Sequence, residues 1–321
     1  MVYNLKPIDA KILAYLYQDS RAPATKIAKA LHISREQVSY KIKKFESDGI
    51  IKGYIPLPSY TRLGYPNLVL VFFKFNKQNN IKEFKQKLKN SKNRITTVET
   101  LAHYDLGVLF IFHSEKERNE YIANLIQEAN ETISDYIMLE PYFSEFYPLK
   151  FLNSTHQSKI FHEYKKEEYK LDEKEKKILS VMNKNANLPV IGISKATSIS
   201  AELIVYKLKR LKEEQVLLGT RAYFDMEKTG YFYSIVLVNF RNFSKANQEK
   251  LRHFAKESGS IDSLMMLLGK PNCYMQLFYK SEKELRATLQ KFKEVFKEES
   301  FDLNILPLKN EGEDINALPF I

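Results

Sequence analysis

The segment ISREQVSYKIKKFESDGIIKGY, residues 33–54, recurs in altered form as ISAELIVYKLKRLKEEQVLLGT, residues 199–220, at a shift of 166 positions. Identities at the same shift begin with Ile12, matched by Ile178, and continue to Tyr65, matched by Tyr231. A register that holds without a gap over this length exceeds what a compositional bias produces. We therefore interpret the chain as two tandem copies of one unit. Two copies are too few for a solenoid, which needs at least three repeats, so we expect a fused pair of domains.

The composition is that of a basic globular protein. A length of 321 residues suggests two or more domains. The net charge of +11 favours a polyanionic partner, and a lysine-rich solvated surface is the alternative. Cys273 is the only cysteine, so no intrachain disulfide can form and a reducing compartment is expected. With no secretory signal and no apolar run of membrane length, we predict a cytoplasmic protein without a membrane partner.

The repeated segment belongs to a helix-turn-helix pattern. Apolar spacing predicts helices over 8–17, 24–31 and 35–48, followed by a strand over 50–55. Ser34 is suited to cap the third helix, and Gly49 stands where a left-handed residue would end it. This order of elements is typical of a winged helix-turn-helix.

The outer face of the third helix suggests contact with double-stranded DNA. Val38, Ile42 and Phe45 point inward, which leaves polar and basic residues outside. The predicted base-reading residues are Arg35, Gln37, Ser39 and Tyr40. The predicted phosphate contacts, from both copies, are Lys41, Lys43, Lys44, Lys52, Lys207, Lys209 and Arg210. A solvated amphipathic helix is the alternative, but this frame in a basic chain favours DNA.

The second unit of each copy alternates strands and helices. In copy one we predict strands at 68–75, 94–101, 106–112 and 136–146, with helices at 81–88 and 115–128. In copy two the strands are 233–240, 261–268, 273–279 and 301–306, with helices at 247–256 and 282–296. The order βαββαβ is the ferredoxin-like sandwich. Its bare sheet face, expected to include several of Phe72, Phe110 and Phe112, would pack on the second copy or on a homodimer partner.

The predicted fold class is therefore α+β, with two copies of a winged helix-turn-helix followed by a ferredoxin-like sandwich. The expected domains are a winged helix-turn-helix at 1–60, a sandwich at 61–152, a linker at 153–170, a second winged helix-turn-helix at 171–226 and a second sandwich at 227–321. The linker is polar and is expected to be partly helical. Its histidines, His156 and His162, lack a helical ligand spacing, so no metal site is predicted.

These residues resemble the Lrp/AsnC family of feast/famine transcriptional regulators. The resemblance rests on Asp9-Ala10-Lys11-Ile12-Leu13, Ile33-Ser34-Arg35, Lys41-Ile42, Gly49-Ile50-Ile51-Lys52-Gly53-Tyr54 and Leu63-Gly64-Tyr65. It implies a winged helix-turn-helix joined to a sandwich that dimerises and often senses amino acids. Because members of that family are usually single-copy, the tandem form implies a pseudo-dimer within one chain, and a further homodimer stays open.

Copy two departs from copy one on the recognition helix. Arg35, Gln37 and Ser39 correspond to residues that cannot hydrogen-bond to bases, namely Ala201, Leu203 and Val205. We therefore expect copy one to supply most of the sequence reading. The second helix, with its degenerate face, is expected to be a backbone clamp or a protein contact.

The loops that match the family's sensor motif, Gly-x-Tyr/Phe-Asp, are also altered. Copy one has Ala102, His103, Tyr104 and Asp105, whereas copy two has Gly269, Lys270, Pro271 and Asn272. Each loop keeps a different half of the motif, and a glycine allows a ligand to approach the backbone closely. These loops are candidate effector sites, and whether either of them binds an effector stays open.

Two other functions are compatible with this fold. One is an architectural protein that coats DNA, because phosphate contacts alone give binding without sequence preference. The other is an enzyme resembling sirohaem decarboxylases, which typically have an Arg-Arg-Ile-Gly wing and cleft histidines. Here the wing reads Lys52-Gly53-Tyr54, and His103 has Lys270 as its counterpart. We predict a protein that is not an enzyme and has no cofactor.

Overall fold

The computed structural model describes residues 3–152, 157–163, 167–309 and 314–321. The predicted linker is only partly within these ranges. His156, Lys165 and Lys166 lie outside the described residues, whereas His162 lies within them.

The first three helices form the predicted helix-turn-helix. They are α1 (Pro7–Gln18), α2 (Ala24–Leu31) and α3 (Arg35–Ser47), and they pack around the fully buried Ile12, Ile27, Val38 and Phe45. The Ser34 hydroxyl accepts a hydrogen bond from the Gln37 amide at 3.1 Å and caps α3. Gly49 ends the helix with a φ of +65°. Both terminal signals of α3 predicted from the sequence are confirmed.

The second helix-turn-helix repeats the first. It consists of α6 (Glu173–Lys184), α7 (Val190–Thr197) and α8 (Ala201–Glu213). Ser200 caps α8 as Ser34 caps α3, with its hydroxyl accepting from the Leu203 amide at 3.4 Å. The buried Ile178, Ile193 and Ile204 stand 166 positions after Ile12, Ile27 and Val38. The repeat in sequence is therefore also a repeat in packing.

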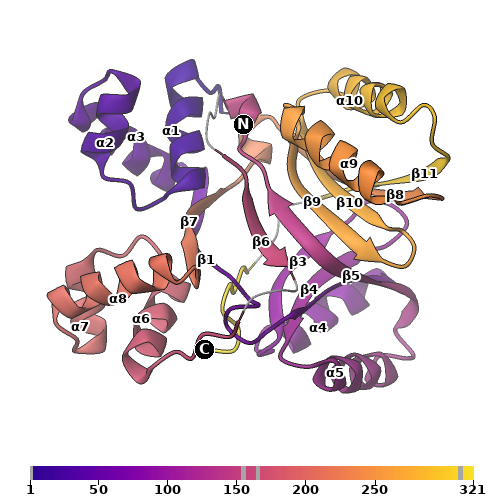
Figure 1. The fold of residues 1–321 in the computed structure, drawn as a ribbon, viewed down its shortest axis with the longest axis horizontal. Helices are drawn as coiled ribbons and strands as arrows, with labels where there is room; N and C mark the ends of the chain where they lie inside the picture. Colours follow the sequence, from indigo (N-terminus) through magenta and orange to yellow (C-terminus); the bar gives the residue numbers. More distant parts are fainter. Residues whose placement is uncertain (1–2, 153–156, 164–166, 310–313) are drawn as a thin grey trace.

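The strand after each helix-turn-helix pairs with its counterpart from the other copy. β1 (Ile51–Pro58) and β7 (Leu217–Phe224) form a two-stranded antiparallel ribbon between the two helical domains (Figure 1). At its centre Ile55 pairs with Arg221, the residue 166 positions later. Such pairing of equivalent residues is the signature of an isologous contact. The ribbon thus has a pseudo-two-fold axis, although both of its strands belong to one chain.

The two sandwiches follow the predicted order, βαββαβ. The first contains β2 (Asn67–Phe75), α4 (Gln78–Leu88), β3 (Arg94–Glu99), β4 (Leu106–Phe112), α5 (Glu115–Glu128) and β5 (Ile133–Phe146). The second contains β8 (Phe232–Phe240), α9 (Lys245–Glu257), β9 (Ile261–Leu268), β10 (Cys273–Tyr279), α10 (Glu282–Val295) and β11 (Phe301–Pro307).

The two sheets join edge to edge. The strand order is β11-β8-β10-β9-β5-β2-β4-β3, and the long β5 pairs with β9 of the other copy, with Glu140 opposite Leu268. The two ends of this order also meet, because Thr100 bridges Leu308 and the Leu101 amide donates to the Pro307 carbonyl at 2.8 Å. Both sheet junctions therefore connect copy one to copy two.

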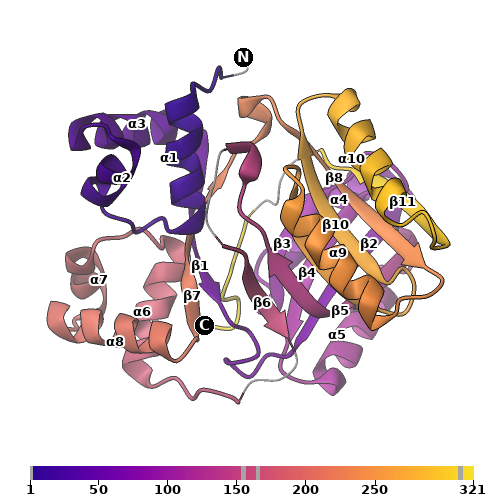
Figure 2. The same ribbon diagram turned by 45° about the horizontal axis from the view of Figure 1, so that its top comes forward.

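Each sheet has helices on one face and the other sheet on its inner face. In Figures 1 and 2, α4 and α5 lie outside one sheet, and α9 and α10 lie outside the other. Phe72, Leu70, Ile235 and Leu237 belong to one core cluster that joins both copies. Phe110 and Phe112 instead pack with Phe84 and Ile122 of α4 and α5. Of the three phenylalanines expected on the bare face, only Phe72 lies there, because the alternation of β4 turns the other two outward.

The predicted linker contributes a strand. β6 (Lys159–Glu163) pairs with the end of β5, and a short 3₁₀ turn (Lys150–Leu152) precedes it. Our expectation of a partly helical linker is wrong for 159–163, because β5 extends far enough to offer these residues a free edge.

The C-terminal residues also connect distant domains. The Ala317 carbonyl accepts from the Tyr60 hydroxyl at 2.9 Å, and Leu318 is fully buried in the core of the second helix-turn-helix.

Among the described residues, no helix combines the length and the apolar character that crossing a membrane requires.

Candidate DNA interface

The exposed face of α3 begins with an arginine in the first helical turn. Arg35 is exposed, and its side chain forms no hydrogen bond or ion pair with any other residue in the described ranges. Tyr40, one turn further along, is 67% exposed, and Ser39 is half-buried beside it. A large aromatic left in solvent on a capped helix, together with a free guanidinium, gives a surface that can contact base edges.

Gln37, predicted as a base-reading residue, also has a structural role at the start of α3. It is the third residue of α3, and its side-chain Oε1 accepts a hydrogen bond from the Ser34 backbone amide at 3.3 Å. The backbone amide of Gln37 in turn donates to the Ser34 hydroxyl. This reciprocal pair is a capping box, which stabilises the start of the helix. In the unbound chain Gln37 therefore supports the helix that carries Arg35.

Lys41 and Lys207, predicted as phosphate contacts, have carboxylate partners inside their own domains. Lys41 forms an ion pair with Asp9, whose side chain is only 2% exposed. Lys207 pairs with Asp172 and with the buried Glu175, the counterpart of Asp9, at 3.3 Å from the latter. Hydrogen bonding to Asp172 raises the pKa of Lys207. Lys41 thus connects α3 to α1 by an ion pair, and Lys207 connects α8 to α6 in the same way.

The remaining basic residues of copy one differ in their surroundings. Lys43 and Lys44 are exposed on α3, and neither forms an ion pair within the described part of the chain. Lys52, on β1, lies 3.8 Å from the Asp225 carboxylate across the ribbon. Lys43 and Lys44 are therefore the lysines of α3 best placed to meet phosphates.

The equivalent face of copy two is apolar. Val205 is 54% and Tyr206 58% exposed on α8, and Ile191 of α7 is 67% exposed. Lys209 forms an ion pair with Glu213 at 3.7 Å, and the Arg210 guanidinium lies 5.7 Å from the ring centre of Tyr169. Val205 and Ala201 offer no side-chain hydrogen bond to a base edge. The two helix-turn-helix units share a scaffold but present different chemistry.

The candidate effector loops are braced by their own polar residues. Asp105 accepts from the Phe75 amide at 2.7 Å, and Asn272 accepts from the Phe240 amide at 3.0 Å. His103 and Gly269 occupy left-handed backbone positions, with φ of +67° and +83°. His103 and Lys270 are exposed, whereas Ala102 and Tyr104 are half-buried. Each loop lies beside a different sheet junction, so Asp105 and Asn272 have an evident structural role.

Comparison with known proteins agrees with the local architecture. The family described as winged helix-turn-helix DNA-binding matches residues 5–52. An HTH-type transcriptional regulator of Pyrococcus furiosus is 26% identical over 138 residues, which is 43% of this chain and 93% of the relative. The regulatory protein AsnC of Haemophilus influenzae is 24% identical over 130 residues, covering 40% of this chain and 87% of AsnC.

Among solved structures, the siroheme decarboxylase NirDL, in co-complex with an iron-uroporphyrin III analogue, superposes with a TM-score of 0.62. It is 18% identical and covers 98% of this chain and 95% of its own. At that identity the likeness concerns the fold alone. The sequence relatives are regulators, and the residues that match the winged helix-turn-helix family are those that build α1, α2 and α3. The chain is thus a homologue of helix-turn-helix transcriptional regulators of the Lrp/AsnC family, with a DNA-binding winged helix-turn-helix at residues 5–52.

Proposed function

We propose that this chain is a sequence-specific transcriptional regulator in which α3 of copy one reads the bases. The observation that supports this most is the free, exposed Arg35 in the first turn of a capped recognition helix. Arginine is the commonest side chain to pair with guanine in the major groove. Ser39 and Tyr40 follow on the exposed part of the same helix, and Lys43 and Lys44 supply cations for the backbone.

Copy two contributes orientation rather than base reading. Its α8 has lost the side chains that correspond to Arg35 and Gln37, and it retains Lys209 and Arg210 for backbone contacts. Its exposed Val205 and Tyr206 make a protein contact the alternative role. With one reading helix for each chain, the preferred site is a non-palindromic sequence. A further homodimer would instead require two inverted half-sites.

Footprinting of the purified chain on genomic DNA separates this proposal from the architectural alternative. A regulator protects discrete sites that share a sequence, and a coating protein protects DNA continuously. Continuous protection, or protection that moves with concentration and not with sequence, would contradict the proposal.

A variant series on one protected site tests the division of labour. Arg35→Ala should lower affinity for the cognate site by about 10- to 100-fold, the worth of a good bidentate base contact. It should change affinity for unrelated DNA much less. Lys43→Ala and Lys209→Ala should weaken cognate and unrelated DNA by similar factors and reduce the salt dependence, because each removes a phosphate contact. Equal loss of specificity in Arg35→Ala and Lys209→Ala would overturn the asymmetry between the copies.

The same proposal holds that the chain acts in the cytoplasm and does not catalyse a reaction. The regulators among its sequence relatives support this, whereas the decarboxylase resembles it in fold alone. Incubation with an iron tetrapyrrole offers a direct check. The proposal predicts no new Soret-region absorbance bound to the protein after gel filtration, and a stoichiometric bound band would contradict it.

A further inference from the structure

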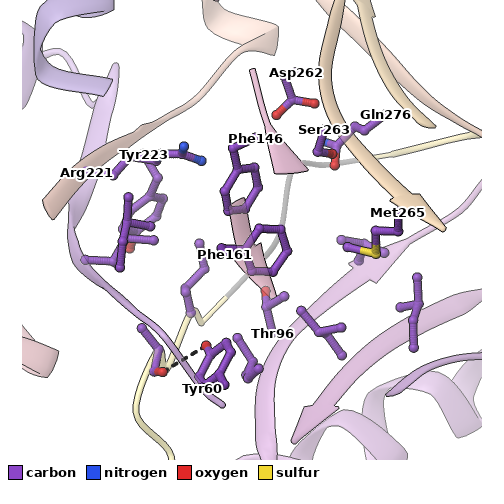
Figure 3. A pocket seen from close by; sticks show the side chains of 18 of the residues that line it. Tyr60, Thr96, Phe146, Phe161, Arg221, Tyr223, Asp262, Ser263, Met265 and Gln276 are labelled. Carbon is purple, nitrogen blue, oxygen red and sulfur yellow. Dashed lines mark hydrogen bonds between the residues drawn. The ribbon is translucent and has the colours of Figure 1, made fainter. Parts of the chain in front are cut away.

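A cavity of about 200 Å³ lies between the two sheets and the β1–β7 ribbon. Its walls come from both copies and are mostly apolar, with Leu70 and Leu109 from one sheet and Ile235 and Met265 from the other. Figure 3 shows these walls around an open centre, with Tyr60 near one end and Asp262 near the other. An engineered apolar cavity of roughly 150 Å³ binds benzene, so this space is sufficient for a one-ring molecule.

One end of the cavity carries a buried charged group. Asp262 of β9 is 4% exposed, and its Oδ2 accepts a hydrogen bond from the Tyr17 hydroxyl at 3.1 Å. That hydroxyl accepts in turn from Arg221 Nη1 at 2.9 Å. The Arg221 guanidinium is stacked between two rings, 3.8 Å from the Tyr17 centre and 4.1 Å from the Phe146 centre. Asp262 and Arg221 therefore form an indirect ion pair bridged by Tyr17.

The second oxygen of this carboxylate is unsatisfied. Asp262 Oδ1 is buried and has no hydrogen-bond donor in the described structure, although its residue lines the cavity. Leaving a buried acceptor without a donor is costly, and few such groups persist in native proteins without a reason. Figure 3 shows the carboxylate of Asp262 and the guanidinium of Arg221 at the same end of the cavity, near the ring of Phe146.

The charged group also breaks the symmetry of the duplication. Arg221 is the counterpart of Ile55, 166 positions earlier, and Asp262 is the counterpart of Ile95, 167 positions earlier in the register that β3 and β9 share against β4 and β10. All four residues line the same cavity. The space thus lies on the pseudo-two-fold axis of the ribbon, yet only copy two supplies charges to it. A structural need common to both copies would not explain this difference.

We propose that this cavity is a binding site for a small, neutral aromatic molecule with a single hydrogen-bond donor, such as a phenol or an indole. The ring would lie between the apolar walls, and the donor of the ligand would hydrogen-bond to Asp262 Oδ1. Neutrality follows from the pairing of Arg221 with Asp262, because a charged ligand would leave a net charge buried. Binding here is independent of whether α3 contacts DNA.

Isothermal titration calorimetry on the full chain, with phenol, indole, toluene, benzylamine and benzoate as probes, tests the proposal. Phenol and indole should bind at least tenfold more tightly than toluene, which lacks a donor, and more tightly than either charged probe. Absence of binding by every probe, or toluene binding as tightly as phenol, would overturn the assignment of Asp262 as the acceptor.

Three variants locate the site. Ile235→Phe fills the cavity from β8 and should abolish phenol binding. Asp262→Asn leaves the charge of Arg221 unbalanced and should shift preference from phenol towards benzoate, a change in selectivity that a merely weakened fold would not produce. Ser260→Ala, just before β9 and outside the cavity lining, is the matched control and should bind phenol like the parent. Unchanged phenol binding in Ile235→Phe, or unchanged selectivity in Asp262→Asn, would refute the site.

Discussion

At the scale of single residues, the two copies distinguish structural from functional side chains. Lys41 and Lys207 are retained at equivalent positions, and in both domains the lysine pairs with a buried carboxylate of the first helix. Arg35 is retained in one copy alone, and it has no internal partner in the described structure. From charge and helical spacing we predicted that all three residues would face DNA. The ion pairs of the two lysines could not be predicted, because the sequence does not show that Asp9 folds against Lys41.

Replacement of Lys41 by methionine tests this structural role. Because the Asp9 side chain is 2% exposed, loss of its partner should lower the free energy of unfolding of this domain by about 3–5 kcal/mol. Lys43→Met, on the exposed face, is the matched control and should change stability by less than about 0.5 kcal/mol. Urea unfolding followed by circular dichroism measures both. Similar stabilities for the two variants would contradict the role.

Two buried titratable groups should give the stability opposite pH dependences. Burial raises the pKa of Asp262 from 3.8 to about 6, so its contribution to stability falls as pH rises from about 4 to 6. Burial lowers the pKa of His162 from 6.5 to about 4, so its contribution rises as pH increases over nearly the same range.

Unfolding free energies at pH 4.5 and 6.5 separate these contributions. Relative to the parent, Asp262→Asn should gain stability on going to the higher pH, whereas His162→Gln should lose it. No pH-dependent difference between a variant and the parent would show that the group titrates in the folded chain as it does in water, and a difference of the opposite sign would contradict the direction of its shift.

At the scale of elements, most helices and strands could be predicted because their apolar spacing is regular. The helices of copy one, the capping of α3 and the order βαββαβ follow from residues close together in sequence. The pairing of β1 with β7 could not be predicted, because the residues of β1 do not indicate which distant strand will pair with its backbone. The same applies to β6, whose five residues gain their conformation from the free edge of β5.

The capping of α3 gives a prediction at this scale. Ser34→Ala removes the acceptor for the Gln37 amide and should cost about 1 kcal/mol of stability, whereas Ser34→Gly should cost only a few tenths. Because Arg35 directly follows the cap, Ser34→Ala should also weaken binding to cognate DNA more than Ser200→Ala does. Thermal unfolding and fluorescence anisotropy measure the two effects. Equal DNA affinities for Ser34→Ala and Ser200→Ala would argue against α3 as the reading helix.

At the scale of the whole molecule, the duplication produces in one chain what two identical chains would form by association. The ribbon pairs equivalent residues about Ile55 and Arg221, and both sheet junctions connect copy one with copy two. One core cluster includes Phe72 from the first sheet and Leu237 from the second. The internal repeat suggested such pairing, but the buried pair Arg221–Asp262 was visible in sequence only as two departures from the repeat.

A shared core predicts cooperative unfolding of the two copies. Differential scanning calorimetry should show one main transition, and Phe72→Ala should move it as a whole, since truncating a fully buried phenylalanine costs about 3–5 kcal/mol. Two resolved transitions, of which only one moves in Phe72→Ala, would indicate that the copies fold independently.

The most direct test of base reading by α3 compares the parent chain with Arg35→Ala on a library of genomic DNA fragments, in dilute buffer and again at physiological salt. The parent should enrich a discrete, non-palindromic sequence at both salt concentrations. Arg35→Ala should still bind DNA in dilute buffer but should lose that enrichment. Identical enrichment by the two proteins, or no retention of DNA by the parent even in dilute buffer, would contradict base reading by α3.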